Sequence, residues 1–329
     1  MDLSTRYLGL ELGCPLVASA SPLALDLGNL RRMEEAGAGA VVLPSIFQED
    51  IENDIEEMER LVAESNPEAS SYFPAGAATN VGPEGYLDLI RRARAAIDIP
   101  VIASLNGITR AGWIDYAKQI EQAGAHALEL NIYYLPTDLS LDGAEVEQRT
   151  LDILVAVKQA VSIPVAVKLS PYFSSVGRMI QRLDAAGADG VVLFNRFYQP
   201  DIDLDDLSLL RDLKLSNRAE IRLPLLWIGA VAGRIKGSIA ASSGVQTAAE
   251  VVKYLFAGAD VVMTTSALLR HGISYMKVLK DGLIADLEAR GAQSVGSIRG
   301  HLRRGATEDS IVYDRVNYIR ILRGGERHD

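Results

Sequence analysis

Short apolar runs alternate with amphipathic segments along the whole chain. One pattern recurs four times, at 34–43, 121–130, 184–193 and 256–263. In each copy a segment with polar positions ends at Ala-Gly, and an apolar run begins a few residues later. Glycine at such a place is typical of a helix C-cap, where the backbone is left-handed. A short apolar run after it predicts a strand buried on both faces.

Two further runs begin with Ile-Pro, and together the chain offers eight candidate strands. They are Leu16–Ser19, Ala40–Leu43, Val101–Leu105, Ala127–Asn131, Val165–Leu169, Val191–Asn195, Ser238–Ala241 and Asp260–Thr264. Eight strands alternating with helices favour a single (β/α)8 TIM barrel over residues 1–329. The seventh strand stays open, because the apolar run 223–231 competes with 235–241 for the same place.

Four segments do not fit the simple repeat. Residues 5–14 predict a hairpin that closes the bottom of the barrel. The long acidic segment from Gln48 to Glu68 predicts an amphipathic helix whose charged face is solvated. After the sixth strand a long excursion predicts a loop over the site. The basic tail, about 299–329, is expected to be partly disordered.

Composition narrows the class of protein. The chain has 329 residues, 48% of them hydrophobic, and a formal net charge of −10. The acidic balance disfavours nucleic acid or an anionic membrane as the main partner. Cys14 is the single cysteine, so an internal disulfide and a cysteine-held iron–sulfur cluster are excluded. The start of the chain lacks a signal-peptide pattern, and we expect a soluble cytoplasmic protein.

Lys168 stands out at the far end of the apolar run IPVAVKLSPYF, residues 163–173. Lysine is rarely buried without a partner, because an unpaired ammonium in a medium of low dielectric constant is costly. Its position therefore indicates a cavity or an anionic group at the carboxyl end of the strand. The alternative is a lysine that extends along the surface to solvent.

The other predicted strands also end in polar or small residues. These include Ser19, Ser45, Asn131, Asn195, Ser243, Gly244, Thr265 and Ser266. In a parallel barrel the carboxyl ends of all strands meet on one face, where the last two strands commonly bind phosphate. Plain turn chemistry is the alternative explanation for the small residues.

In this order and spacing the strand-end motifs resemble the dihydroorotate dehydrogenase family, especially its soluble class 1 branch. The resembling segments cover nearly the whole chain, namely LGLELGCPLVASAS, HALELN, IPVAVKLSPYF, GVVLFN and SSGVQTAAEVVKYLFAGADVVMTTSALL. The resemblance implies FMN as cofactor, a dihydropyrimidine as small-molecule substrate, no metal, and a homodimer.

The resemblance also implies roles for individual residues. Ser19, Ser45, Asn131 and Phe194 would lie near the flavin, and Lys168 would stabilise negative charge at the N1/O2 edge of the flavin. Asn80, Asn131 and Asn195 would hydrogen-bond the substrate, because an amide offers both a donor and an acceptor. The FMN phosphate would be held by Ser243, Gly244, Thr265 and Ser266.

Two positions depart from the family pattern. Pro44 stands where the family has a lysine, and Tyr134 stands where it has a cysteine or serine as catalytic base. Oxidation of dihydroorotate removes a hydride from one carbon and a proton from its neighbour, so a proton acceptor is needed. A tyrosine has an ordinary pKa near 10 and needs strong perturbation to act as a base.

The sequence therefore predicts an FMN-dependent dehydrogenase that oxidises dihydroorotate or a related dihydropyrimidine. Two alternatives remain at this point. One is a flavin-binding paralogue that has lost catalysis together with its base. The other is a barrel lyase that uses Lys168 as a Schiff-base amine.

Overall fold

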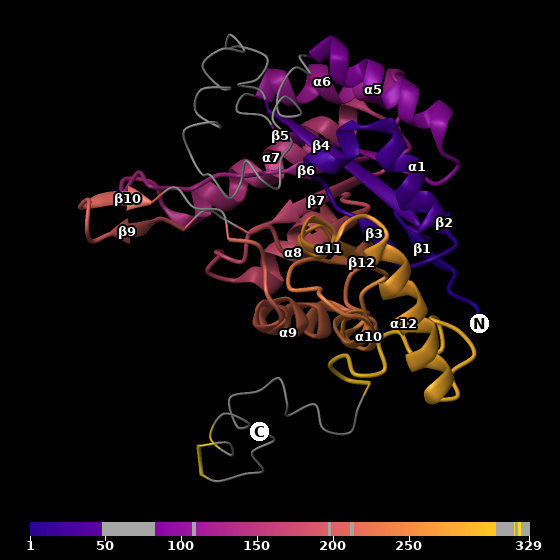
Figure 1. Cartoon of the computed structure of the whole chain (residues 1–329). Coiled ribbons are helices and arrows are strands. Elements are labelled where there is room, and N and C mark those ends of the chain that lie inside the picture. The colour runs from indigo at the N-terminus through magenta and orange to yellow at the C-terminus, as the bar shows by residue number, and fades with distance from the viewer. Residues whose placement is uncertain are drawn as a thin grey trace.

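The predicted barrel is confirmed. In the computed structural model eight parallel strands close into one barrel with helices around it (Figure 1). The structure describes residues 1–47, 83–106, 110–196, 199–210, 214–306, 319, 322 and 323. The barrel strands, in order around it, are β3 (Leu16–Ala18), β4 (Ala40–Phe47), β5 (Val101–Asn106), β6 (Ala127–Asn131), β7 (Val165–Leu169), β8 (Gly190–Leu193), β11 (Ser238–Ala241) and β12 (Val261–Thr264).

Helices follow the strands and cover the outside of the barrel. They are η1 (Pro22–Leu25), α1 (Leu27–Glu35), α5 (Pro83–Ala96), α6 (Arg110–Gln122), α7 (Gly143–Ala160), α8 (Val176–Ala185), η2 (Arg218–Ile221), α9 (Arg222–Val231), α10 (Ala248–Ala257), α11 (Ser266–His271) and α12 (Tyr275–Ala289). None of the helices in the described ranges has the length and apolar composition needed to cross a bilayer.

The repeated Ala-Gly pattern does what the sequence predicts. Gly37, Gly124, Gly187 and Gly258 all have positive φ, between 94° and 116°. Each of them reverses the chain from a helix into the next strand, a conformation that costs a residue with a Cβ atom more than it costs glycine.

The N-terminal hairpin closes the bottom of the barrel as predicted. Strands β1 (Thr5–Tyr7) and β2 (Leu10–Leu12) pair antiparallel, and Tyr7, Leu8 and Leu12 pack into the same apolar cluster as the inward residues of the barrel strands. The Leu8 amide donates to the Ser238 hydroxyl at 3.0 Å. The lower half of the barrel is therefore filled by side chains, which leaves the upper half for polar groups.

The predicted seventh strand, Ser238–Ala241, is confirmed as β11, because the competing run 223–231 lies in helix α9. The end of the second strand needs correction. Strand β4 does not end at Leu43 but continues to Phe47, past a register shift between Val42 and Ser45 that contains Pro44. Proline donates no ladder hydrogen bond and is tolerated in a strand at such an irregularity. The bulge lets Ser45 pair with Ser104 of β5.

The excursion after the sixth strand forms a second hairpin, β9 (Asp201–Asp203) with β10 (Ser208–Leu210), which projects from the barrel (Figure 1). The helix predicted within 48–68 lies outside the described residues. The same is true of Asn80 and of most of the tail beyond Ala306.

Candidate functional site

A small cavity lies at the carboxyl ends of β3, β7, β8, β11 and β12. Its volume is about 140 Å³. The structure brings eight of the predicted site residues to its wall: Ser19, Lys168, Phe194, Asn195, Ser243, Gly244, Thr265 and Ser266. Residues far apart in the sequence thus meet as the barrel topology requires.

Lys168 is buried and paired. Its Nζ lies 3.3 Å from Oε1 of Glu129, and the two side chains are 10% and 1% exposed. Side chains alternate along a strand, and Ala127 and Ala166 point into the barrel, so Glu129 on β6 and Lys168 on β7 point inward too. The anionic partner expected for the lysine is therefore a carboxylate inside the barrel.

The second oxygen of that carboxylate is unusual. Oε2 of Glu129 is buried and accepts no hydrogen bond from any described residue. Burying a charged oxygen without a donor costs free energy. The pair is thus a charged group held in the interior at a cost, directly below the cavity that Lys168 lines.

A chain of polar contacts runs around the upper barrel from this pair. Ser104 Oγ donates to Glu129 Oε1 at 3.5 Å, and it lies 2.8 Å from Ser45 Oγ. Asn131 Nδ2 donates to Ser45 Oγ at 3.2 Å. Asn195 Nδ2 donates to Asn131 Oδ1 at 2.6 Å. The two predicted substrate amides are therefore in contact, and Ser45 and Asn131 join the site through hydrogen bonds although they do not line the cavity.

Two buried tyrosines flank Glu129. Burial raises the pKa of both Tyr7 and Tyr86, and the charge of Glu129 adds to the effect. On Tyr86 the hydrogen bond with the Ser104 backbone partly opposes the rise in pKa. Tyr86 hydroxyl also donates to the Ser104 carbonyl at 3.1 Å. A phenol whose pKa is raised stays protonated at neutral pH, so neither side chain is suited to act as the base.

Strand β11 ends in a tight turn at Ser243 and Gly244. Ser243 and Gly244 have φ of 78° and 73°. A Cβ on Gly244 would lie 2.9 Å from Ile221 N and 3.0 Å from Asn217 O, so only glycine fits there. Thr265 Oγ1 donates to the Ser19 carbonyl at 3.1 Å, which ties the end of β12 to the end of β3.

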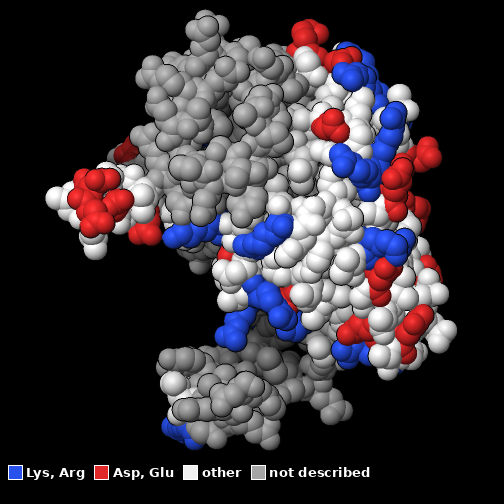
Figure 2. All heavy atoms as spheres, viewed as in Figure 1, with Lys and Arg blue, Asp and Glu red and all other residues white. Residues whose placement is uncertain are grey.

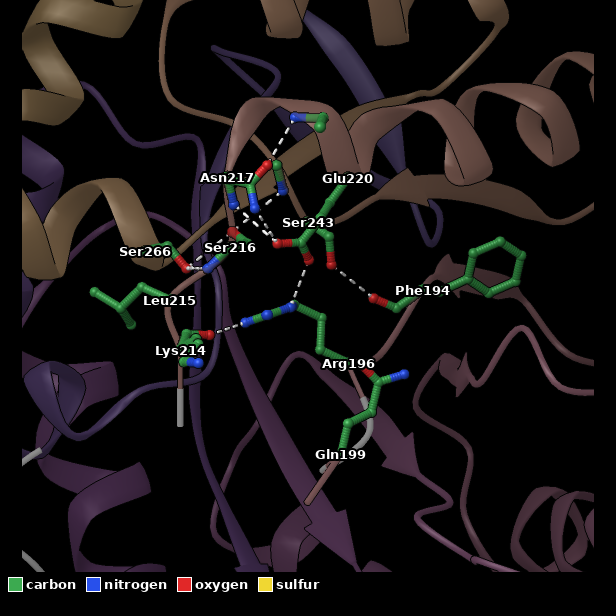
Figure 3. A network of polar contacts seen from close by, with 12 residues as sticks. Phe194, Arg196, Gln199, Lys214, Leu215, Ser216, Asn217, Glu220, Ser243 and Ser266 are labelled. Atoms are coloured by element: carbon green, nitrogen blue, oxygen red, sulfur yellow. Dashed lines mark hydrogen bonds and ion pairs between the residues drawn. The ribbon is translucent and has the colours of Figure 1, made fainter. Parts of the chain in front are cut away.

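Ser216 lines this end of the cavity, and it belongs to a network of polar contacts with residues of the neighbouring loops (Figure 3). Ser216 Oγ lies 3.0 Å from Ser266 Oγ and accepts from the Gly244 amide at 3.2 Å. Arg196 donates to the Lys214 carbonyl and forms an ion pair with Glu220 at 2.7 Å. Ser216 thus occupies the small-residue end of the cavity, and the sequence did not single it out because only the fold brings it there.

Tyr134 lies elsewhere. It lines a separate, mostly apolar cavity of about 270 Å³ with residues of its own loop, of α7 and of 170–173. The guanidinium carbon of Arg149 lies 4.4 Å from the centre of its ring, a distance typical of a cation–π contact. Tyr134 does not line the first cavity.

The donor set of the first cavity suits an anionic ligand. Serine and threonine hydroxyls, backbone amides at the start of α11 and the Lys168 ammonium can all donate hydrogen bonds. A cavity of about 140 Å³ admits a phosphate or a ring edge, whereas whole-ligand sites measure roughly 300–1,000 Å³. In the described ranges no group of three or more His, Cys, Asp or Glu side chains is arranged to hold a metal ion.

The family model and the relatives that match this chain all name the same family. Residues 68–287 match the family described as dihydroorotate dehydrogenase. A relative named dihydroorotate dehydrogenase B (NAD(+)), catalytic subunit, from Geobacillus sp. is 31% identical over 180 residues, which cover 53% of this chain and 57% of that relative. One named putative dihydroorotate dehydrogenase A (fumarate), from Aeropyrum pernix, is 25% identical over 317 residues, which cover 92% and 98%.

A third relative, dihydroorotate dehydrogenase A (fumarate) from Lactobacillus delbrueckii subsp. bulgaricus, is 26% identical over 216 residues, 63% of this chain and 69% of the relative. The similarity therefore extends over the whole barrel in some relatives and over little more than half of the length of others.

Proposed function

This chain belongs to the dihydroorotate dehydrogenase family, and from that premise we propose that it is an FMN-dependent oxidoreductase that oxidises dihydroorotate or a related dihydropyrimidine. The observation that carries the proposal is the buried ammonium of Lys168 in one cavity with the hydroxyls of Ser19, Ser243 and Thr265. A cation and a set of phosphate donors at the same barrel end suit a flavin mononucleotide.

In this proposal the cofactor lies with its phosphate on Ser243, Gly244, Thr265 and Ser266. Ser19 and Phe194 line the path towards Lys168, and Ser45 supports it through its contacts with Ser104 and Asn131. Lys168 would place positive charge beside the N1/O2 edge of the flavin. Bound FMN would supply the hydride acceptor, at its N5 atom. The contribution of Lys168 is electrostatic, because a fixed cation favours the negative charge that reduction creates. The cavity must widen to admit the ring.

The substrate would be oriented by Asn131 and Asn195. Their amides contact each other at 2.6 Å, so a bound pyrimidine would exchange this contact for hydrogen bonds to its own N–H and C=O groups. Asn80 remains a proposed third substrate amide, outside the described residues.

We propose Tyr134 as the proton acceptor because it stands at the base position of the family pattern; it lines a separate cavity in this structure, so its loop would have to bring it to the substrate. If so, Tyr134→Phe slows anaerobic flavin reduction by dihydroorotate by about 10²–10⁴-fold, the usual contribution of a general base. The matched control is Tyr133→Phe in the same loop, which keeps a rate close to that of the wild type. Stopped-flow absorbance measures the rate of flavin reduction in both variants, compared at equal FMN content. A Tyr134→Phe rate equal to that of Tyr133→Phe would exclude Tyr134 as the base.

We also propose that the chain forms a homodimer through the β9–β10 hairpin. Ile202, Leu204, Leu207 and Leu209 are 60%, 80%, 83% and 66% exposed on it, and acidic side chains surround them (Figure 2). A projecting two-stranded hairpin is marginally stable alone, and large apolar exposure of this kind is typical of interfaces.

Sedimentation equilibrium tests the dimer. We expect twice the chain mass of 35.5 kDa for the wild type, and a monomer for the double variant Leu204→Asp/Leu207→Asp. Val278→Asp is the control, because Val278 is 55% exposed on α12, far along the chain from the hairpin. A monomeric wild type, or a dimeric double variant, contradicts the proposal.

A further inference from the structure

A second, larger cavity lies not at the site above but at the opposite end of the barrel. It has a volume of about 860 Å³. The hairpin β1–β2, the loop before β11 and residues 295–303 line it. Ser238 begins β11 and Asp260 precedes β12, so this cleft opens at the amino ends of the strands, whereas Lys168 lies near a carboxyl end.

The cleft carries four cationic side chains, Arg6, Lys236, Arg299 and Arg303, and two carboxylates, Asp189 and Asp260. Both carboxylates are already satisfied. Asp189 binds Lys158 Nζ at 2.6 Å and the Val165 amide at 2.7 Å. Asp260 accepts from the Ile239 amide at 2.7 Å and pairs with Arg299.

Two of the four cationic side chains form no ion pair with a described residue. Arg6 faces Glu11 at 3.5 Å, but Lys236 and Arg303 have no carboxylate within ion-pair distance among the described residues. The chain as a whole is acidic, with a net charge of −10. A local excess of positive charge in a concave site of such a protein attracts an anion by focusing the field.

The guanidinium of Arg303 packs against two glycines, Gly233 and Gly300. A Cβ on Gly233 would lie 3.2 Å from its Nε, and a Cβ on Gly300 would lie 3.1 Å from its Nη1. Both glycines have positive φ, 75° and 72°. The guanidinium therefore lies against bare backbone on two sides, which holds it at the wall of the cleft while its charge stays unpaired.

We propose that this cleft binds a small organic polyphosphate, with Arg303 and Lys236 as its main contacts. A guanidinium fork recognises phosphate oxygens in pairs. A cavity of 860 Å³ lies in the range of small-ligand sites, roughly 300–1,000 Å³. Nucleic acid is disfavoured, because a long polyanion would also meet the acidic surface of the remaining chain. The inference does not depend on the proposed oxidoreductase activity.

Isothermal titration calorimetry with ATP and with tripolyphosphate tests the site. The protein is used as purified, and the variants below leave Ser243 and Thr265 intact, so a change in binding is assigned to this cleft and not to the other cavity. We expect saturable binding that weakens as salt rises. The double variant Arg303→Gln/Lys236→Gln should weaken it at least about tenfold, because two charge-assisted contacts are lost.

The matched control is Arg31→Gln/Lys118→Gln, which removes the same charges from exposed positions on α1 and α6. It should bind both probes as the wild type does. All the replaced side chains are exposed, so the variants should unfold at the wild-type temperature without ligand. No binding up to millimolar probe, or equal affinity in the two double variants, would overturn the proposal.

Discussion

Glu129→Ala is expected to destabilise the protein by about 3–5 kcal/mol, the usual cost of leaving one partner of a buried ion pair alone. The carboxylate is 1% exposed and lies 3.3 Å from the Lys168 ammonium, whose side chain is 10% exposed. Without it the largely buried ammonium has no counterion among the described residues. Urea unfolding measures the effect as a lower midpoint with an unchanged slope.

Two controls separate the buried pair from charge in general. Asp88→Ala breaks an exposed pair with Arg92, in which the side chains are 62% and 55% exposed, and should cost less than about 1 kcal/mol. The double variant Glu129→Gln/Lys168→Met removes both charges and should recover most of the stability. It should not recover flavin reduction, because the cation is gone. A cost of Glu129→Ala no larger than that of Asp88→Ala would contradict this account of the site.

Gly244→Ala is expected to abolish tight FMN binding. The residue has a φ of 73°, which costs a residue with a Cβ roughly 1–2 kcal/mol. The added methyl would also lie 2.5 Å from Ile221 Cγ2 and 2.9 Å from Ile221 N, and overpacking of this kind costs a further ~1–3 kcal/mol. The turn or η2 must shift, and either movement displaces the Ser243 and Ser216 hydroxyls.

The matched control is Gly291→Ala, at a φ of 67° with no atom within 4 Å of the added Cβ. Gly291→Ala carries the free-energy cost of a positive φ, but its added methyl group contacts no other atom. Fluorescence titration of the apoprotein with FMN compares the two variants, and urea unfolding gives their stabilities. If Gly244→Ala binds FMN as tightly as Gly291→Ala, the turn at Ser243 and Gly244 does not hold the phosphate.

The barrel could be predicted from the sequence because its signals are local. A glycine that must be left-handed and the apolar run after it lie within a few residues of each other, as at Gly187 and β8. The ambiguity at 223–231 was also local, since a short run apolar on all sides fits a buried helix as well as a strand. The capping box of Asn217 and Glu220 just before α9 starts the helical segment.

Site residues that follow a strand, such as Asn195 after β8, can be predicted from their position. Lys168 and Glu129 both lie within their strands, β7 and β6. A charged residue inside an apolar run is the signal at both positions, and it marks Glu129 as well as Lys168. Ser216 depends on the path of a loop. Its contacts with Gly244 and Ser266 join positions 28 and 50 residues away, which no local pattern encodes.

The central claim is that the cavity at Lys168 holds FMN and that a dihydropyrimidine reduces it. The most direct measurement is the visible spectrum of the purified protein, taken anaerobically before and after addition of dihydroorotate. We predict the absorbance bands of oxidised flavin, which bleach when dihydroorotate is added to the wild type and persist in Glu129→Gln/Lys168→Met. A colourless protein that takes up no added FMN, or a bound flavin that neither dihydroorotate nor any related dihydropyrimidine bleaches, would contradict it.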